Sequence, residues 1–327
     1  MDPHEAPITF AVVGEALVDL VETLGSPNTF TAHAGGSPFN VALTLGRLGQ
    51  QVSLIARSGR DAFGRLLEAK ARQSGVSLDR WQIVDEPTSL AVASLDDAGR
   101  AQYDFYLDAT AGLGWDASLV DLAPSGGVLH LASVASWRQP SGRVIQAMQQ
   151  RAFGGGDTLI SYDPNVRAAL IANVDVARQS IERCIGAAHL IKASDEDAAL
   201  LYPDEPLEVV ARRWCALGAQ LVVLTLGESG AVAFGASGEL VRRPGLPIRV
   251  ADTVGAGDSF AGGLLAGIAD SGLATCAALR SAVAAGDPRI GAALEQAIVV
   301  SAITCERSGA EPPTRAELDA RLASLRA

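Results

Sequence analysis

Two carboxylates flank three small residues late in the chain. In DTVGAGDSF, Asp252 and Asp258 stand on either side of Gly255, Ala256 and Gly257, and an apolar run with helical spacing follows. Small residues that open a helix leave backbone N–H groups exposed at the positive end of the helix dipole, and such a place favours an anion. Asp258 would repel a phosphate there, so it is either a plain helix cap or a residue with a chemical role.

A second glycine-rich stretch, AGGSPFNVALTLGRLG, lies in the first half of the chain. Ser37 is expected to cap a helix that has Pro38 at its first position, because both residue types are favoured there. Asn40 falls in the first turn, off the apolar stripe, either by chance or for a function. The pair Gly35-Gly36 lets another group approach the backbone closely, and this favours a function.

Polar groups follow several apolar runs. Asp163 follows TLISY, Ser194 follows HLIKA, and Thr225 and Gly227 end the run LVVLTLG. If these runs are parallel strands, the polar groups lie at the carboxyl ends, where open α/β sheets bind ligands. Each group alone is a weak signal, because Asp-Pro-Asn is also ordinary turn chemistry. Their common edge indicates a binding site.

These residues need a scaffold that brings distant segments together. Short continuous apolar runs suit strands that are buried on both faces of a parallel sheet, and longer runs with helical spacing follow them. The alternation predicts an α/β fold with a doubly wound, mostly parallel sheet flanked by helices. The expected strands are 8–13, 52–56, 128–132, 158–162, 189–193 and 221–226, and the expected helices are 38–48, 62–73, 140–152, 175–187, 206–217, 258–270, 274–285 and 290–306.

Two segments break this alternation. Residues 17–34 and 88–107 read as exposed antiparallel strands, and the second has a turn signal at 97–99. Such strands do not fit easily into a parallel sheet. We therefore expect a small β-structured lid on a single domain that spans residues 1–327.

The composition excludes several classes of partner. The chain has 327 residues and a net charge of −11, so it lacks the basic footprint of a nucleic-acid-binding protein. No apolar run reaches membrane-spanning length without a charge. The four cysteines lie far apart, and the N-terminus has no basic segment of the kind found in signal peptides. We expect a cytoplasmic protein with reduced thiols.

Other phosphate-binding motifs are missing from the sequence. A Walker A loop contains Gly-Lys, but the chain has only two lysines, Lys70 and Lys192, and glycine precedes neither of them. The motif set of protein kinases is also missing. The dinucleotide fingerprint is matched only in a relaxed form, by GLGWDA, which puts a tryptophan in the turn.

The two glycine-rich stretches resemble the N- and C-terminal signatures of the PfkB, or ribokinase-like, carbohydrate kinases. GGSPFNVALTLGRLG and DTVGAGDSFAGGLLAG occur in the order that this family has. GEALVD, FYLDATA, DPNVR, TLGESG and RSGAEPP extend the resemblance over nearly the whole chain. GEALVD, FYLDATA and DPNVR together look most like the fructokinase branch.

The resemblance implies a chemical role for the C-terminal signature. Asp258 would be the catalytic base that takes a proton from a sugar hydroxyl. The N–H groups of Gly255, Ala256 and Gly257 would form an anion hole for the transferring phosphoryl group. Phosphoryl transfer needs this positioning and charge neutralisation, and a carboxylate beside the anion hole suits a hydroxyl that lies between the two.

By the same resemblance, residues from both halves of the chain would hold the sugar. Those implied are Asp19, Gly35, Gly36, Asn40, Asp163 and Arg167. The nucleotide would be ATP, and the residues implied for it are Ser194, Thr225, Gly227 and Gly230.

The resemblance also implies metal ions. Asp252, Val254 and Gly309 resemble a monovalent-cation site, which would take K⁺. Many members have the motif N-x-x-E, tied to Mg²⁺, where this chain has Ser194 and Asp197. Because Asp is one methylene shorter than Glu, a water-mediated Mg²⁺ contact would be preserved, lengthened or lost.

The sequence therefore indicates an ATP-dependent sugar kinase, with fructose as the first candidate substrate. A 2-keto-3-deoxygluconate kinase, or another sugar or nucleoside kinase of the family, is the alternative within the class. A catalytically idle sugar-binding regulatory protein is the alternative from another class. A lid of this kind often makes dimers in the family, so a homodimer is a further expectation.

Overall fold

The computed structural model describes residues 8–23, 26, 28–95 and 101–326. The strands from β12 to β4 of its larger sheet run parallel, and β13 pairs antiparallel with both β12 and the edge strand β14. The larger sheet has the spatial order β14 (Gly238–Arg243), β13 (Ala231–Gly235), β12 (Leu221–Thr225), β11 (Leu190–Ser194), β10 (Leu159–Asp163), β9 (Val128–Ala132), β1 (Thr9–Val13) and β4 (Gln51–Ile55).

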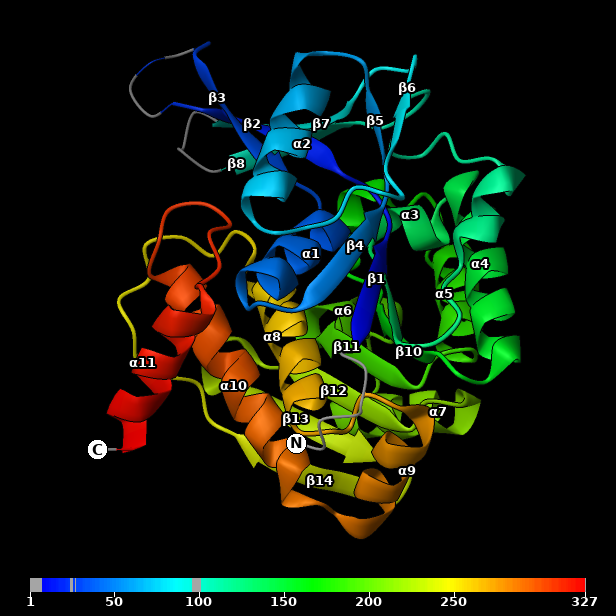
Figure 1. Cartoon of the computed structure of the whole chain (residues 1–327), viewed down its shortest axis with the longest axis vertical. Coiled ribbons are helices and arrows are strands. Elements are labelled where there is room, and N and C mark those ends of the chain that lie inside the picture. Colours follow the sequence, from blue (N-terminus) through cyan, green and yellow to red (C-terminus); the bar gives the residue numbers. More distant parts are fainter. Residues whose placement is uncertain (1–7, 24–25, 27, 96–100, 327) are drawn as a thin grey trace.

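Helices cover both faces of this sheet (Figure 1). The core of one face includes residues of α1 (Ser37–Arg47), α2 (Ala62–Gln73), α8 (Ala256–Asp270), α9 (Cys276–Ala285), α10 (Pro288–Cys305) and α11 (Arg315–Arg326). The core of the other face includes residues of α3 (Val134–Trp137), α4 (Ser141–Gly155), α5 (Val174–Ile185), α6 (Asp195–Leu201) and α7 (Leu207–Leu217). No helix in the described part of the chain is long and apolar enough to cross a membrane.

The two cores form because successive side chains of a strand point to opposite faces of the sheet. In β9, Val128 belongs to the core on the side of α1 and α8, and Leu129 belongs to the core on the side of α4 and α5. The doubly wound α/β fold predicted from the continuous apolar runs is therefore confirmed.

A second sheet of four strands lies above the larger one in Figure 1. The outer pairs are antiparallel and β2 pairs with β7 in parallel. The strands are β3 (Phe30–Gly35), β2 (Leu17–Glu22), β7 (Ser89–Leu95) and β8 (Ala101–Tyr106), in this spatial order. These strands, called the lid sheet below, overlap residues 17–34 and 88–107, where the sequence predicted exposed antiparallel strands. That the sheet acts as a lid stays a prediction. The predicted turn at residues 97–99 lies outside the described residues.

The start of α1 differs from the prediction. Gly36, with φ 103°, is the cap and the helix begins at Ser37, so the assignment of Ser37 as the N-cap was wrong. The Ser37 hydroxyl instead accepts a hydrogen bond of 2.7 Å from the side-chain amide of Asn165. Local propensity could not reveal this partner, because it lies 128 positions away.

Candidate active site

Asp258 lies in the first turn of α8 and its residue is only 7% exposed. Gly255 caps the helix with φ 74°, a left-handed conformation that favours glycine. The Ala256 N–H donates to Thr253 O over 3.2 Å, so this member of the predicted anion hole has an acceptor within the loop. A Cβ on Gly262 would lie 2.6 Å from the Thr44 side chain, and this close approach fixes α8 against α1.

Two side-chain amides hold the carboxylate of Asp258. The Nδ2 of Asn40 donates to Oδ2 over 2.8 Å, and the Nδ2 of Asn165 donates to Oδ1 over 3.0 Å. Asn165 has a φ of 38°, a backbone conformation that Asn tolerates better than most residues. The two amides come from α1 and from the loop after β10, so three separate segments set the direction of the carboxylate.

Asp19 of β2 lies close enough to Asp258 for their charges to interact. Burial, the main cause, and the charge of Asp258 raise the pKa of Asp19 to about 6, and the charge of Arg167 opposes this shift. A Cβ on Gly35 would lie 2.1 Å from Asp19 Oδ2, so only glycine leaves room for the carboxylate. The structure therefore brings together the predicted sugar-binding residues Asp19, Gly35, Asn40 and Arg167.

Gly36 packs against the connection between β1 and β2. A Cβ there would lie 2.7 Å from Glu15 O. Glu15 is itself only 2% exposed, and its Oε2 accepts a hydrogen bond of 3.1 Å from Ala135 N. Burial raises the pKa of Glu15 to about 7, against the lowering effect of hydrogen bonds from Ser133 and Ala135. No local pattern around Glu15 predicts that this glutamate is buried.

Asp163, at the end of β10, is fully buried. Its Oδ2 accepts a hydrogen bond of 2.8 Å from the ammonium of Lys192, and its Oδ1 accepts one of 3.1 Å from Asn165 N. Burial raises the pKa of Asp163 to about 6, and the charge of Lys192 opposes the shift. The carboxylate is thus engaged with protein groups, and a contact between Asp163 and a sugar stays a prediction.

Ser194 and Asp197 form a capping box at the start of α6. The Ser194 hydroxyl accepts from Asp197 N over 3.0 Å, while Asp197 Oδ2 accepts from Ser194 N over 2.9 Å. Asp197 Oδ1 accepts from Val166 N over 2.7 Å. Both carboxylate oxygens therefore already carry a backbone hydrogen bond, which a direct bond to a metal ion would have to share.

The predicted ATP-binding residues lie at the neighbouring strand ends. Thr225 ends β12 and pairs in register with Ser194 of β11. Gly227 and Gly230 follow in the turn before β13, with φ 54° and 95°. A Cβ on Gly230 would lie 2.1 Å from Arg243 O, so this turn packs directly on the end of β14.

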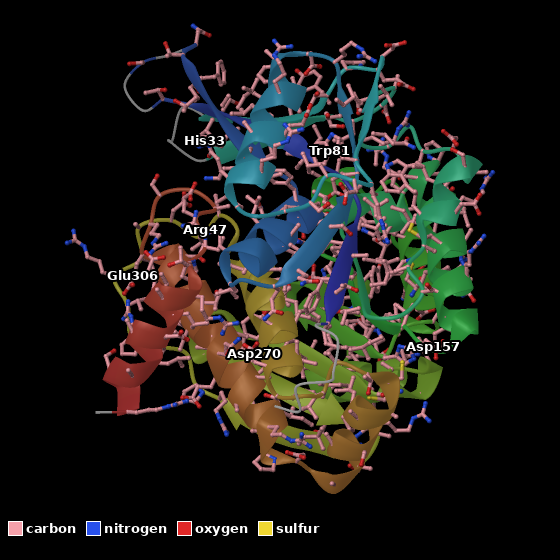
Figure 2. The ribbon with its side chains drawn as sticks, viewed as in Figure 1. His33, Arg47, Trp81, Asp157, Asp270 and Glu306 are labelled. Atoms are coloured by element: carbon pink, nitrogen blue, oxygen red, sulfur yellow. The ribbon has the colours of Figure 1, made fainter. Side chains whose placement is uncertain are left out.

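Asp252 joins the loop before α8 to the segment after α10. Its Oδ1 accepts from Val254 N over 3.0 Å and its Oδ2 accepts from Gly309 N over 2.9 Å, so the three predicted cation-site residues lie together. His33, labelled on the lid sheet in Figure 2, comes close to this segment: a Cβ on Gly309 would lie 4.0 Å from its Nδ1. No group of three or more His, Cys, Asp or Glu side chains in the described ranges is arranged to hold a metal ion.

Sequence reasoning missed three buried polar residues: Asn165, Lys192 and Glu15. Asn165 stands in DPNVR, where its type was attributed to turn chemistry, and Lys192 was considered only as a Walker lysine. Lys192 could have been recognised from its place inside an otherwise apolar strand pattern. A lysine is almost never fully buried unless it is paired, so this position predicts a buried partner of opposite charge.

Comparison with known proteins agrees with this geometry. A family model described as pfkB family carbohydrate kinase matches residues 8–315. A fructokinase from Rhizobium leguminosarum bv. trifolii is 33% identical over 266 residues, which are 80% of this chain and 80% of the relative. An ATP-dependent 6-phosphofructokinase from Thermoanaerobacterium thermosaccharolyticum is 29% identical over 260 residues, 78% of this chain and 80% of the relative.

Solved structures have the same fold. A fructokinase from Xylella fastidiosa with bound ATP superposes with a TM-score of 0.87 at 26% identity, covering 98% of this chain and 99% of that one. A fructokinase double mutant from Vibrio cholerae O395, with fructose, ADP and potassium bound, gives 0.83 at 25% identity, covering 97% and 99%. The chain therefore belongs to the pfkB family of carbohydrate kinases and is a sugar kinase.

Proposed function

We propose that this kinase transfers the γ-phosphoryl group of ATP to a hydroxyl group of fructose. The observation that carries the proposal is the Asp258 carboxylate, held by Asn40 and Asn165 beside the N-terminus of α8. This arrangement offers a proton acceptor next to a site that favours negative charge. The fructokinases among the similar proteins support ATP as the phosphoryl donor and fructose as the phosphoryl acceptor.

In this mechanism, the attacking hydroxyl lies between Asp258 and the γ-phosphate. The new O–P bond forms while the bond to the β-phosphate oxygen breaks and ADP leaves. Asp258 accepts the hydroxyl proton, and backbone N–H groups of the Gly255–Gly257 segment stabilise the negative charge on the transferring group. Because Thr225 and Ser194 lie at the carboxyl ends of neighbouring parallel strands, and Gly227 and Gly230 lie in the turn after β12, we assign the ATP site to these four residues.

The polar groups around Asp258 suit a neutral polyol. Since the Nδ2 of Asn40 is bonded to Asp258, its buried Oδ1 is the free end of the amide and has no partner among the described residues. A buried acceptor without a donor is costly, and a sugar hydroxyl would supply one. The Asp19 carboxylate can accept hydrogen bonds from two further hydroxyls.

Two cations belong to this proposal. Mg²⁺ would neutralise the charge of the ATP phosphates. Asp197 would contact it through water, because both of its oxygens already accept backbone hydrogen bonds. K⁺ would be held near Asp252, Val254 and Gly309, as the family resemblance implies.

Two charged substrates compete with fructose. Similarity to a 6-phosphofructokinase makes fructose 6-phosphate a candidate substrate. The guanidinium of Arg167 makes 2-keto-3-deoxygluconate another candidate, because it could bind a carboxylate in a bidentate manner. The charge of Arg167, however, already acts on Asp19, and Asp19 would repel a second anion. This favours the neutral sugar.

The test is a comparison of kcat/KM across acceptors with Mg-ATP. The acceptors are fructose, fructose 6-phosphate, 2-keto-3-deoxygluconate, ribose and adenosine. We expect fructose to rank first. If any other acceptor exceeds fructose tenfold, about 1.4 kcal/mol in transition-state binding, the fructose assignment is overturned. Release of ADP with none of the five would instead favour the idle sugar-binding protein.

Arg167→Ala separates the neutral from the acidic substrate. It should lower fructose use by about tenfold, but lower the use of a sugar acid by more than about 100-fold, because it would remove the carboxylate's charged partner. Arg212→Ala, which removes an exposed arginine of α7, is the matched control and should change neither rate. Equal losses for both substrates would contradict a charge-specific role of Arg167.

A further inference from the structure

Lys192 of β11 is buried beside the start of α8. Its ammonium donates to Asp163 Oδ2 over 2.8 Å, and the two side chains are 4% and 0% exposed. A Cβ on Gly257 would lie 3.2 Å from Lys192 Nζ. The ammonium therefore lies against the first turn of the helix that carries Asp258.

This position is unfavourable for a cation that serves stability alone. The N-terminus of a helix carries partial positive charge and repels an ammonium group. A buried ion pair also loses the hydration of both charges, and apolar residues of the same size often serve the fold equally well. The molecule nevertheless places two sources of positive potential at one spot, an arrangement that an anion would stabilise.

The neighbouring carboxylates keep Lys192 charged. Burial lowers its pKa, but the charges of Asp163, Asp197 and Asp258 outweigh burial, and the net shift is upward. Of the three N–H donors of the ammonium, one is engaged with Asp163 within the described chain. Asp197 and Asp258 already accept other hydrogen bonds on each of their oxygens.

We propose that Lys192 is a second catalytic residue, whose ammonium binds the oxygens of the phosphoryl group as it passes from nucleotide to sugar. The proposal rests on phosphoryl transfer at Asp258, not on fructose as the acceptor. Negative charge is spread over these oxygens in the transition state, and a preorganised buried cation stabilises it strongly. Asp163 is then the positioning residue that directs the ammonium.

The two lysines of the chain make a direct test possible. In a Lys70→Arg variant labelled with isotopic lysine, the single side-chain amine signal in the NMR spectrum belongs to Lys192. We expect this signal to shift when ADP, aluminium fluoride and an accepted sugar are bound together, since the fluoride complex mimics the transferring group. Saturation with AMP should leave the signal in place.

Calorimetry shows whether nucleotide is bound in the same samples. If nucleotide binds and the Lys192 signal is identical with AMP and with the fluoride complex, the proposal is overturned while the kinase assignment stands. If no nucleotide binds at all, the role of Lys192 and the proposed phosphoryl transfer at Asp258 fail together. The wild-type protein, in which the Lys70 signal serves as an internal reference, should show the same shift of one signal only.

Variants distinguish a catalytic from a structural lysine. Lys192→Met should lower kcat by about 10²–10³-fold. Arg212→Met, at an exposed position of α7, should leave it unchanged. Lys192→Met leaves Asp163 buried without its partner, so the double variant Lys192→Met/Asp163→Asn removes both charges and restores the balance. A catalytic lysine predicts that the double variant melts close to wild type but stays as slow as Lys192→Met. Recovery of kcat to within threefold of wild type would show a structural ion pair and overturn the proposal.

Discussion

The carboxylate of Asp258 accepts an amide N–H on each oxygen, and this fixes its direction before any substrate binds. Such preorganisation matters because a base acts only within hydrogen-bonding reach of the proton that it removes. The two donors also constrain substitutions. An asparagine at position 258 would turn its own NH₂ group toward either Asn40 or Asn165, since only one of its two terminal atoms is an acceptor.

Asp258→Asn should lower kcat by about 10²–10⁴-fold, because it removes the proton acceptor and retains the shape. The dissociation constant of ATP, measured by calorimetry, should change little. Ser301→Ala is a suitable control, since it removes a hydroxyl that contacts Ala256 O from α10 and carries no proton in the mechanism. A variant that keeps more than a third of the wild-type kcat, with chemistry shown to limit the rate, would exclude Asp258 as the base.

At this scale the sequence predicted residues that lie inside recognisable motifs. Asn40 and Asp258 are examples, and the structure places them 2.8 Å apart across 218 positions of the chain. Asn165 and Lys192 were not predicted, because their importance comes from which groups face them after folding. A side chain's partner across strands depends on register and backbone direction, and one sequence does not contain this information in a local pattern.

Among the elements, the loop before α8 is stabilised by contacts that come from far away. Asp252 binds Gly309 N, and Glu311 pairs with Arg47 of α1 over 3.2 Å and with Lys70 of α2. The Gly255 cap lies directly against Ala310, which a Cβ at position 255 would meet at 2.6 Å. The geometry of the helix start is therefore coupled to the segment after α10, where the proposed K⁺ would bind.

This coupling leads to a test with cations. EDTA should abolish activity and added Mg²⁺ should restore it, because the ATP phosphates would lie close to carboxylates in the proposed site. At constant ionic strength, rates should be higher in K⁺ than in tetramethylammonium, since the larger ion cannot order the loop around Asp252. Equal rates in the two salts would refute the K⁺ site and leave the Mg²⁺ requirement untouched.

The types of most long elements followed from periodicity, because continuous apolar runs and helical stripes are local properties. The antiparallel hairpin of β13 and β14, the short helices α3 and α6, and the pair of β5 (Arg57–Gly59) and β6 (Gln82–Val84) were not predicted. These elements are short or lie at an edge, and tertiary contacts decide their conformation more than intrinsic propensity does.

For the whole molecule, buried acids make stability depend on pH. The pKa of Glu15 is about 7 in the folded protein, against 4.5 as its ordinary value, because burial disfavours its charge. A raised carboxyl pKa stabilises the fold below the ordinary value, and this contribution is lost as pH rises through the folded value. For Glu15, the loss therefore falls between about pH 4.5 and pH 7.

Glu15→Gln should flatten this dependence, since glutamine stays neutral and can still accept from Ala135 N. The wild-type Tm should fall relative to that of the variant from pH 4.5 to pH 7, corresponding to at most about 1.4 kcal/mol per pH unit in unfolding free energy. Burial lowers the pKa of His130 to about 3, so below about pH 6.5 this histidine makes stability rise with pH. Its effect is the same in the wild type and in Glu15→Gln and does not change the comparison. Glu228→Gln, at an exposed position, is the control. Parallel profiles of Tm against pH for wild type and Glu15→Gln would contradict a raised pKa of Glu15 in the folded protein.

The packing of α1 has a consequence for how the chain is made. Every residue from Ser37 to Leu45 is buried, and the helix that covers part of this face, α8, begins at Ala256. At 5–20 residues per second, a ribosome needs roughly 10 to 45 s to travel from Asn40 to Asp258. During that interval the nascent chain exposes an apolar helix without its partner, so the catalytic centre is completed only after the start of α8 has been synthesised.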